Sequence, residues 1–137
     1  MSTPEPSSFA VVEPGARCPC LSGEVYGACC RPFHAGDAVA PTAERLMRSR
    51  YSAYVVGDAD YLLATWHPRT APKSLELDPA QRWFRLDVVA GERGGLLDTV
   101  GVVEFVAHYR NGREAGTQHE TSAFIRVKGR WLYVDAT

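Results

Sequence analysis

All four cysteines of this chain lie within thirteen residues, where Cys18, Cys20, Cys29 and Cys30 form the pattern C-x-C-x8-C-C. Clustered cysteines in a chain without a secretion signal indicate a metal site rather than a disulfide framework. Four thiolates can close a tetrahedral shell around one zinc ion and leave no position for substrate, so the predicted site is structural. Two disulfides or four free thiols are the alternative. His34 is a substitute ligand if only one of the two adjacent cysteines binds.

The composition is that of an ordinary soluble domain. The 137 residues include 45% hydrophobic and 23% charged residues with a formal net charge of -1, which suits one domain, or one domain with a small attachment. The charges form no basic cluster, so we expect no binding to duplex nucleic acid. Residues 1–16 lack a basic segment and are interpreted not as a signal peptide but as a tail that is flexible unless it lies across the domain. No apolar stretch is long enough to span a membrane, and we expect a cytoplasmic protein.

The first strongly periodic segment predicts a helix. Its stripe of apolar and aromatic residues at helical spacing comprises Ala43, Leu46, Met47, Tyr51 and Tyr54. Thr42 is the expected N-cap, and Gly57 the expected end. Ser49 and Ser52 lie on the opposite side, where we expect solvent. Arg50 lies within the stripe, so we expect its stem to pack along the core while its guanidinium reaches water; pairing with a buried carboxylate is the alternative.

A second, shorter helix is predicted from Ala59 to Trp66. Asp58 is placed to cap its start. The helix must stop near His67, because Pro68 disfavours helical backbone in the residue before it. The proline-containing segment 68–79 is expected to form a loop across the domain surface.

Beyond residue 82 the hydrophobic period changes to two, which predicts strands. The expected strands cover residues 82–89, 97–109, 116–127 and 130–136. Tight turns at Asn111-Gly112 and Lys128-Gly129 join the last three strands into an antiparallel meander. Because helices come first and strands later, the predicted fold class is α+β.

The two turns also predict which side chains share a face of the sheet. Two-residue loops place Arg110 opposite Arg113 and Val127 opposite Arg130, and opposed residues point to the same side. One face then carries Thr99, Gly101, Val103, Phe105, Gln118, Glu120, Ser122, Phe124, Trp131, Tyr133 and Asp135. Large aromatic groups around a few polar ones make this face a candidate small-molecule pocket.

The stretch CPCLSGEVYGACC resembles the SEC-C zinc motif, C-P-C-G-S-G-x-x-Y-x-x-C-[CH], found at the C-terminus of the SecA translocation ATPase. Leu21 departs from this motif, which usually has glycine there. The segments PTAERLMRSRYSAYVVGDADYLLATWHPRTAP, GVVEFVAHYR, HETSAF and GRWLYVD are similar to the YchJ family of small bacterial proteins. The resemblance implies a SEC-C motif at residues 17–34 joined to a nuclear-transport-factor-2-like domain at residues 35–137. In such a domain a curved antiparallel sheet and a few helices form a cone.

The first of two functional hypotheses is an adaptor. Its zinc motif would contact a protein or a ribosome-associated partner, as the SEC-C motif of the translocation ATPase contacts the SecB chaperone. Leu21, Val25 and Tyr26 would then be exposed. This hypothesis is preferred to an enzyme. We expect a monomer or a homodimer, the latter through the outer sheet face at Val100, Val102 and Ile125.

The second hypothesis is a small-molecule enzyme or binding protein that uses the cavity of the cone. By analogy with other proteins of this fold, Glu120 or Asp135 would act as acid or base. The cavity candidates are Glu120, Asp135, His119, Trp66, His67 and Arg50. In the alternative interpretation the aromatic side chains only fill the core, and Glu120 pairs with Arg50 or lies at the rim.

Overall fold

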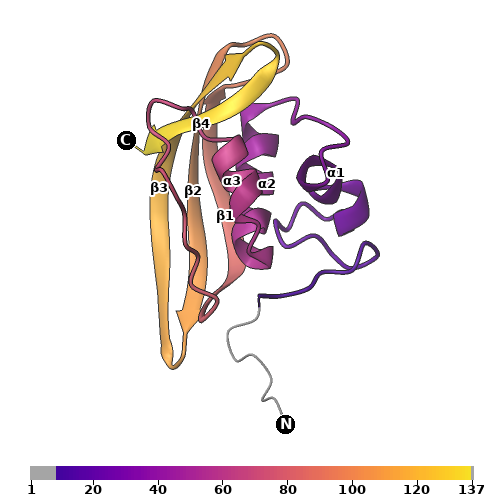
Figure 1. Cartoon of the computed structure of the whole chain (residues 1–137), viewed down its shortest axis with the longest axis vertical. Coiled ribbons are helices and arrows are strands. Elements are labelled where there is room, and N and C mark those ends of the chain that lie inside the picture. The colour runs from indigo at the N-terminus through magenta and orange to yellow at the C-terminus, as the bar shows by residue number, and fades with distance from the viewer. Residues whose placement is uncertain (1–8, 137) are drawn as a thin grey trace.

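The computed structural model describes residues 9–136 and arranges them in three layers (Figure 1). Its elements are η1 (Tyr26–Ala28), α1 (Arg31–His34), α2 (Ala43–Val56), α3 (Ala59–Ala64), β1 (Gln81–Arg93), β2 (Val100–Asn111), β3 (Glu114–Val127) and β4 (Arg130–Ala136). The strands form one curved antiparallel sheet in the order β1-β2-β3-β4. α2 and α3 lie against one face of this sheet. Residues 17–34, which include the four cysteines, η1 and α1 and are called the cysteine segment below, lie beyond α2. The predicted α+β fold is confirmed.

The chain offers no helix with the length and apolar character needed to cross a membrane within the residues that the structure describes.

The helices begin and end where the sequence predicts, to within two residues. The Thr42 hydroxyl accepts a hydrogen bond from a first-turn amide of α2 at 3.1 Å, as an N-cap does. Gly57 ends α2 with a φ of 77°, a left-handed conformation that glycine adopts without steric cost. Asp58 caps α3 by accepting from the Tyr61 amide at 3.0 Å. α3 ends at Ala64, slightly before the predicted end.

α2 is buried on two sides, although its periodicity predicts one buried face. Ser49 and Ser52 are both 0% exposed, so the expectation that they meet solvent is wrong. The cysteine segment covers this side of α2: the Ser52 hydroxyl donates to Cys30 Sγ at 3.4 Å and lies 3.7 Å from Cys18 Sγ. α2 therefore separates the cysteines from the sheet.

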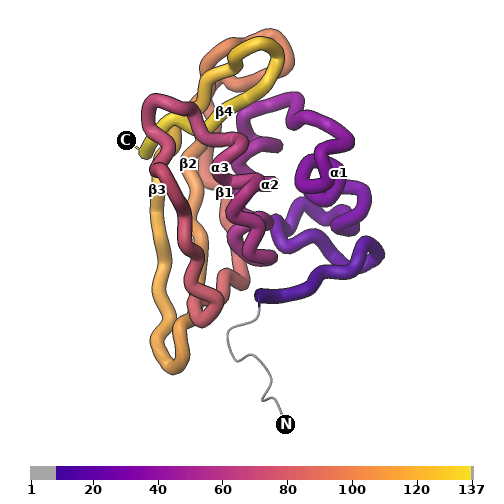
Figure 2. Tube along the Cα trace, viewed as in Figure 1, coloured from indigo at the N-terminus to yellow at the C-terminus, as the bar shows by residue number. Residues whose placement is uncertain are grey.

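Residues 9–16 lie against the domain (Figure 2). The Phe9 ring covers Gly57, with ring atoms as close as 2.4 Å to the position that a Cβ would take. The Pro14 carbonyl accepts a hydrogen bond from the Gly27 amide at 2.8 Å. Residues 9–16 therefore lie across the domain, which is the alternative to a flexible tail; residues 1–8 lie outside the described residues.

The hairpin between β2 and β3 turns one residue later than predicted. Asn111 pairs with Glu114 around the loop Gly112-Arg113. Gly112 has a φ of 63°, which suits the first loop position of a type II′ turn. The register differs by two residues from the predicted one, and because side chains alternate with a period of two, every residue keeps its predicted face.

A bulge in β1 changes the predicted alternation of that strand. The pairing with β2 shifts between Trp83 and Arg85, so Phe84 is the extra residue. As a result Trp83 and Leu86 both face the helices, whereas Phe84 is 55% exposed. An alternating pattern does not encode such a two-against-one pairing.

A second shift, between β3 and β4, moves Asp135. The shift lies between Ala123 and Phe124 and pairs Asp135 with Ala123. Paired residues share a face, so Asp135 points away from the face that carries Glu120, and it is exposed. Its predicted place beside Glu120 is therefore wrong.

Gly101 of β2 allows the sheet to approach the start of α2. A Cβ at this position would lie 2.6 Å from Gly94 Cα and 3.0 Å from Ala43 Cβ. We expect Gly101→Ala to lower the free energy of unfolding by about 2 kcal/mol, because the backbone must shift to admit the methyl group. Denaturant unfolding measures the change. Gly91→Ala is the control, since a Cβ there would meet only the Val102 carbonyl, at 3.8 Å; an equal loss in both variants would contradict the prediction.

Candidate metal centre and pocket

The four cysteine thiols converge on one point beside α2. Their Sγ atoms all lie within 4.8 Å of one another, and all four residues are buried. Cys29 Sγ is 3.6 Å from Cys20 Sγ and 3.9 Å from Cys30 Sγ. Sulfurs at the corners of a tetrahedral zinc site are about 3.8 Å apart, given Zn–S bonds of about 2.3 Å. The four cysteines form no disulfide, so the donor set fits a tetrahedral, thiolate-bound metal ion.

Two chain reversals bring the cysteine pairs together. In the first, the Leu21 amide donates to the Cys18 carbonyl at 3.0 Å, and the Cys18 amide donates to the Glu24 carbonyl at 2.9 Å. In the second, Cys29 is the C-cap of η1 and Cys30 is the N-cap of α1. Each pair is thus held by backbone hydrogen bonds of its own segment.

Two side chains of α2 hold the cysteine segment in place. The Ser52 hydroxyl donates to Cys30 Sγ, as described above, and Arg48 Nη1 donates to the Cys20 carbonyl at 2.7 Å. Hydrogen bonds within the cluster lower the pKa of Cys20 and raise the pKa of Cys18 and Cys30, so in the absence of a metal ion Cys20 is the thiol that ionises most readily. Hydrogen bonds of this kind orient ligands and raise metal affinity.

His34 lies outside the cysteine cluster and is not placed as a substitute ligand. Its Nδ1 is 2.6 Å from the Tyr26 hydroxyl, and its Nε2 is 2.8 Å from the Ser49 carbonyl. Burial lowers the pKa of His34, so the neutral ring donates from Nε2 and accepts from Tyr26 at Nδ1. His34 therefore links the cysteine segment to α2. Tyr26 is 7% exposed, and its predicted role in an exposed contact surface is wrong.

Leu21 occupies a strained backbone position in the first reversal. Its φ is 62°, a left-handed conformation that costs a non-glycine residue about 1–2 kcal/mol. Leu21→Gly is expected to raise the free energy of unfolding by about 1 kcal/mol, after the greater entropy of unfolded glycine is subtracted. Denaturant unfolding of the zinc-loaded protein measures it. Val25→Gly is the control: Val25 is similarly exposed but has a φ of -74°, so this variant should lose stability. A loss for Leu21→Gly as well would contradict the strain.

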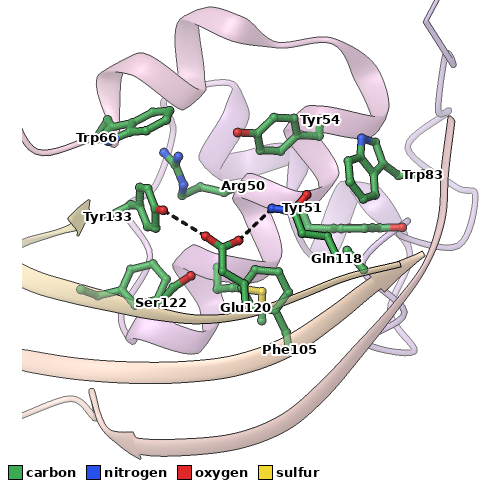
Figure 3. A pocket seen from close by; sticks show the side chains of 13 residues that line it. Arg50, Tyr51, Tyr54, Trp66, Trp83, Phe105, Gln118, Glu120, Ser122 and Tyr133 are labelled. Carbon is green, nitrogen blue, oxygen red and sulfur yellow. Dashed lines mark hydrogen bonds between the residues drawn. The ribbon is translucent and has the colours of Figure 1, made fainter. Parts of the chain in front are cut away.

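A pocket of about 260 Å³ lies between α2 and the sheet (Figure 3). Residues from all four strands, from α2 and from the segment after α3 line it: Met47, Arg50, Tyr51, Tyr54, Trp66, Trp83, Phe105, Ala107, Gln118, Glu120, Ser122, Phe124 and Tyr133. Most of these side chains are aromatic or aliphatic, and a few polar groups converge among them. This is the usual composition of a small-molecule site.

Arg50 is buried inside the pocket wall, so the expectation that its guanidinium reaches water is wrong. It is 5% exposed, and its guanidinium lies 5.0 Å from the centre of the Trp66 ring and 4.6 Å from that of Tyr133. Nη1 donates to the Leu62 carbonyl and to the Thr65 hydroxyl, each at 2.7 Å. These aromatic faces and acceptors favour the cation, although burial lowers the pKa of Arg50.

Glu120 projects from β3 into the pocket, toward Arg50 (Figure 3). Its Oε1 accepts a hydrogen bond from the Tyr133 hydroxyl at 3.1 Å, and its Oε2 accepts one from Gln118 Nε2 at 3.2 Å. Burial raises the pKa of Tyr133, and the negative charge of Glu120 raises it further. Tyr133 therefore remains the proton donor in this pair.

Two buried polar groups of the pocket wall, Trp66 Nε1 and Ser122 Oγ, have no partner in the described part of the chain. A third, the Tyr51 hydroxyl, has among these residues only an interaction with the Arg85 backbone. Ser122 is 1% exposed. An unsatisfied buried polar group typically costs about 1–3 kcal/mol, and buried polar groups in native proteins are with few exceptions paired with protein, water or an ion.

The other predicted cavity residues lie elsewhere. His119 is on the outer face of β3, where Nε2 is 2.6 Å from Glu104 Oε2. His67 follows Trp66 but does not line the pocket, and its amide donates to the Tyr133 carbonyl at 2.8 Å. Asp135 is excluded by the shift described above. The structure thus brings together Arg50, Trp66 and Glu120 and leaves out His67, His119 and Asp135.

Sequence reasoning did not name Tyr54 and Trp83 as site residues. The helical pattern placed Tyr54 at the end of the buried stripe but gave no sign of a pocket there. The orientation of Trp83 could not be predicted because it depends on the bulge at Phe84. The ring centres of Tyr54 and Trp83 are 6.3 Å apart, and together they form one wall of the pocket.

A cysteine cluster that precedes a curved antiparallel sheet and its covering helices defines a SEC-C motif protein with a nuclear-transport-factor-2-like domain. The family described as "YchJ, middle NTF2-like domain" matches residues 42–136. The chain belongs to this family, whose relatives are named UPF0225 proteins.

Similar proteins agree with both the family and the fold. The UPF0225 protein SCO1677 of Streptomyces coelicolor is 52% identical over 122 residues, which cover 89% of this chain and 95% of that protein. A SEC-C motif containing protein from Rhodopseudomonas palustris has a solution structure similar to this one, with a TM-score of 0.75 and 32% identity over 88% of this chain and 96% of that chain. A SEC-C motif containing protein from Psychrobacter arcticus gives a TM-score of 0.69 and 30% identity over 86% and 80%.

Proposed function

We propose that this protein binds a small molecule in the pocket between α2 and the sheet. The observation that carries the proposal is the presence of two buried polar groups, Trp66 Nε1 and Ser122 Oγ, that line the cavity without a partner among the described residues. A ligand that bonds to them would satisfy both. Among the residues that line the pocket, Glu120 alone has a carboxylate, so the geometry favours binding over catalysis by a pair of carboxylates.

Ser122→Ala tests this function. We expect the variant to be more stable than the wild type by about 1 kcal/mol, because it removes an unsatisfied buried hydroxyl. It should also bind pocket ligands more weakly. The measurements are thermal unfolding of the free proteins, and ligand-observed NMR with small ring compounds that carry an amide, amine or carboxylate group.

Thr121→Ala is the matched control, since Thr121 is the neighbouring residue of β3 and does not line the pocket. It should leave binding unchanged. If Ser122→Ala loses stability and binds every compound as well as the wild type does, Ser122 is an ordinary core residue and the pocket is not a ligand site.

The cysteine cluster supports a structural role beside the pocket. We propose that its four thiolates hold one zinc ion in a closed shell, because four ligands complete a tetrahedron and leave no position for a substrate. Cys18, Cys20, Cys29 and Cys30 would be the ligands. The bound ion would fix the segment that covers the outer side of α2.

An adaptor role for the same segment is a second candidate function. Leu21 is 44% exposed and Val25 is 41% exposed; Leu21 lies within the first reversal of the cysteine segment, and Val25 directly follows it. Exposed apolar side chains on a rigid segment suit contact with a protein partner. The partner would be a protein or a ribosome-associated factor.

A double variant, Leu21→Asp with Val25→Asp, tests the adaptor role without removing a thiol. It should retain one zinc ion and lose a partner that the wild type captures reversibly with a defined stoichiometry. Aspartate tolerates the left-handed backbone at residue 21. A partner that binds both proteins equally would contradict this contact surface.

A further inference from the structure

The pocket contains two opposite charges that do not neutralise each other directly. Arg50 and Glu120 both line it, and within the part of the chain described here no ion pair within 4.0 Å includes either of them. Glu120 nevertheless influences Arg50 electrostatically. The formal charge of the two groups together is zero, so a ligand of either net charge would leave one of them opposed by a like charge.

Each of the two charged groups has unused hydrogen-bonding capacity. Among the described residues, Arg50 donates two hydrogen bonds, both from Nη1, whereas a guanidinium has five N–H donors. Each oxygen of Glu120 accepts one hydrogen bond and has a second lone pair. A donor on the ligand can therefore reach Glu120 while an acceptor on the ligand reaches Arg50.

The two unpartnered groups add to this polarity. Trp66 Nε1 is a donor only, and it belongs to the ring that stacks on Arg50. Ser122 Oγ, two residues from Glu120 on the same face of β3, can donate or accept. The Trp66 and Arg50 side of the pocket thus offers donors, and the Glu120 side offers acceptors.

The remaining walls are apolar and close together. Tyr54, Trp83 and Phe105 present aromatic surface to the cavity. A volume of about 260 Å³ is below the range of about 300–1,000 Å³ that is usual for drug-sized ligands. The ligand body is therefore small and apolar, the size of one ring or a branched alkyl group.

We propose that the ligand has no net charge and carries, on a small apolar body, an acceptor group for Arg50 and an adjacent donor group for Glu120. A zwitterionic amino acid with an apolar side chain and a primary amide both have this chemistry. The proposal rests on the proposed function, because it names the class of molecule that the same pocket takes.

Four probes that share a phenyl group and differ in their charged groups test whether the pocket selects ligands of zero net charge. They are L-phenylalanine, a zwitterion; 3-phenylpropanamide, which is neutral; 3-phenylpropanoate, an anion; and phenethylamine, a cation. Dissociation constants are measured by NMR titration with the full-length wild type, Glu120→Gln and Arg50→Met. Arg50→Met retains most of the side-chain volume, and Glu120→Gln retains the shape of the carboxylate, so both variants are expected to fold.

The wild type should bind at least one of the two probes of zero net charge about tenfold more tightly than the anion or the cation, since each of these leaves either Glu120 or Arg50 facing a like charge. Glu120→Gln should shift the preference toward the anion, and Arg50→Met should shift it toward the cation. The reversal of charge preference between these two variants is a result that a purely structural role of Arg50 and Glu120 would not produce.

Two results would overturn the inference, and only the second would also refute the proposed function. Binding of the probes with the same charge preference in all three proteins would refute the charge selection and retain the proposed function. If no protein binds any of the four probes, both the charge selection and the pocket as a site for this class of molecule are wrong.

Discussion

Replacement of Cys18 and Cys29 with serine is expected to abolish zinc binding and to unfold residues 17–34, while the sheet and α2 stay folded. Each substitution removes one ligand from a different cysteine pair, and a zinc ion cannot hold the remaining two thiolates in a closed tetrahedral site. Without the ion, the segment has only two short helices, η1 and α1, of three and four residues, which are not stable alone.

Metal analysis and amide hydrogen exchange measure the two effects separately. Zinc content should fall from one ion per chain to none, and protection should be lost at residues 17–34 but retained in β2 and β3. Removal of zinc from the wild type with a chelator should give the same exchange pattern. Cooperative loss of protection in the sheet would show that the cysteine segment and the domain fold as one unit.

Arg50→Ala is expected to lower the free energy of unfolding by about 3 kcal/mol, which is large for one substitution. The change removes two charge-assisted hydrogen bonds, to Leu62 and Thr65, and two cation–π contacts. It also removes the positive charge that faces Glu120 across the pocket. Chemical denaturation of the purified variant measures the loss.

Two variants separate the sources of this effect. Arg45→Ala on the same helix should cost less than about 1 kcal/mol, because Arg45 is exposed and its one ring contact is with Phe33. Arg50→Met should cost less than Arg50→Ala, because it fills most of the space. Equal stability of Arg50→Ala and the wild type would mean that the buried guanidinium does not stabilise the fold.

Local signals of the sequence predicted the elements of this fold because each depends on a few neighbouring residues. Thr42, Gly57 and Asp58 are at the predicted helix ends, and Lys128-Gly129 forms the predicted turn with Val127 opposite Arg130. The spacing of the cysteines predicted their convergence for the same reason, since all four lie in one short segment.

Features that depend on packing between distant segments were not predictable in this way. Ser49 and Ser52 were predicted to face solvent because small polar residues are common on exposed helix faces. Ser52 is instead covered by the cysteine thiols, and Ser49 by Tyr61 and His34. Asp135 and Trp83 lie on other faces of the sheet than predicted, because one extra residue in a strand breaks the alternation of side chains between the residues on its two sides. The guanidinium of Arg50 was predicted to reach water because its partners, which are carbonyl, hydroxyl and aromatic groups of other segments, cannot be recognised from the sequence around it.

α2 links the two sites of the molecule. Ser52 on its outer side contacts the cysteine thiols, while Met47, Arg50, Tyr51 and Tyr54 line the pocket on its inner side. A metal ion that orders the cysteine segment therefore also supports the helix that forms one wall of the pocket. In this way a closed metal site with no room for substrate would contribute to the proposed binding function.

The indole N–H signals of the three tryptophans test the central claim, that the pocket binds a small molecule. Trp66 and Trp83 line the pocket, whereas Trp131 lies outside it and donates from Nε1 to the Pro41 carbonyl at 3.2 Å. Titration with 3-phenylpropanamide should shift the Trp66 and Trp83 signals in two-dimensional NMR spectra and leave that of Trp131 in place. Unchanged Trp66 and Trp83 signals at saturating concentrations of the amide, or a shift confined to Trp131, would contradict the claim.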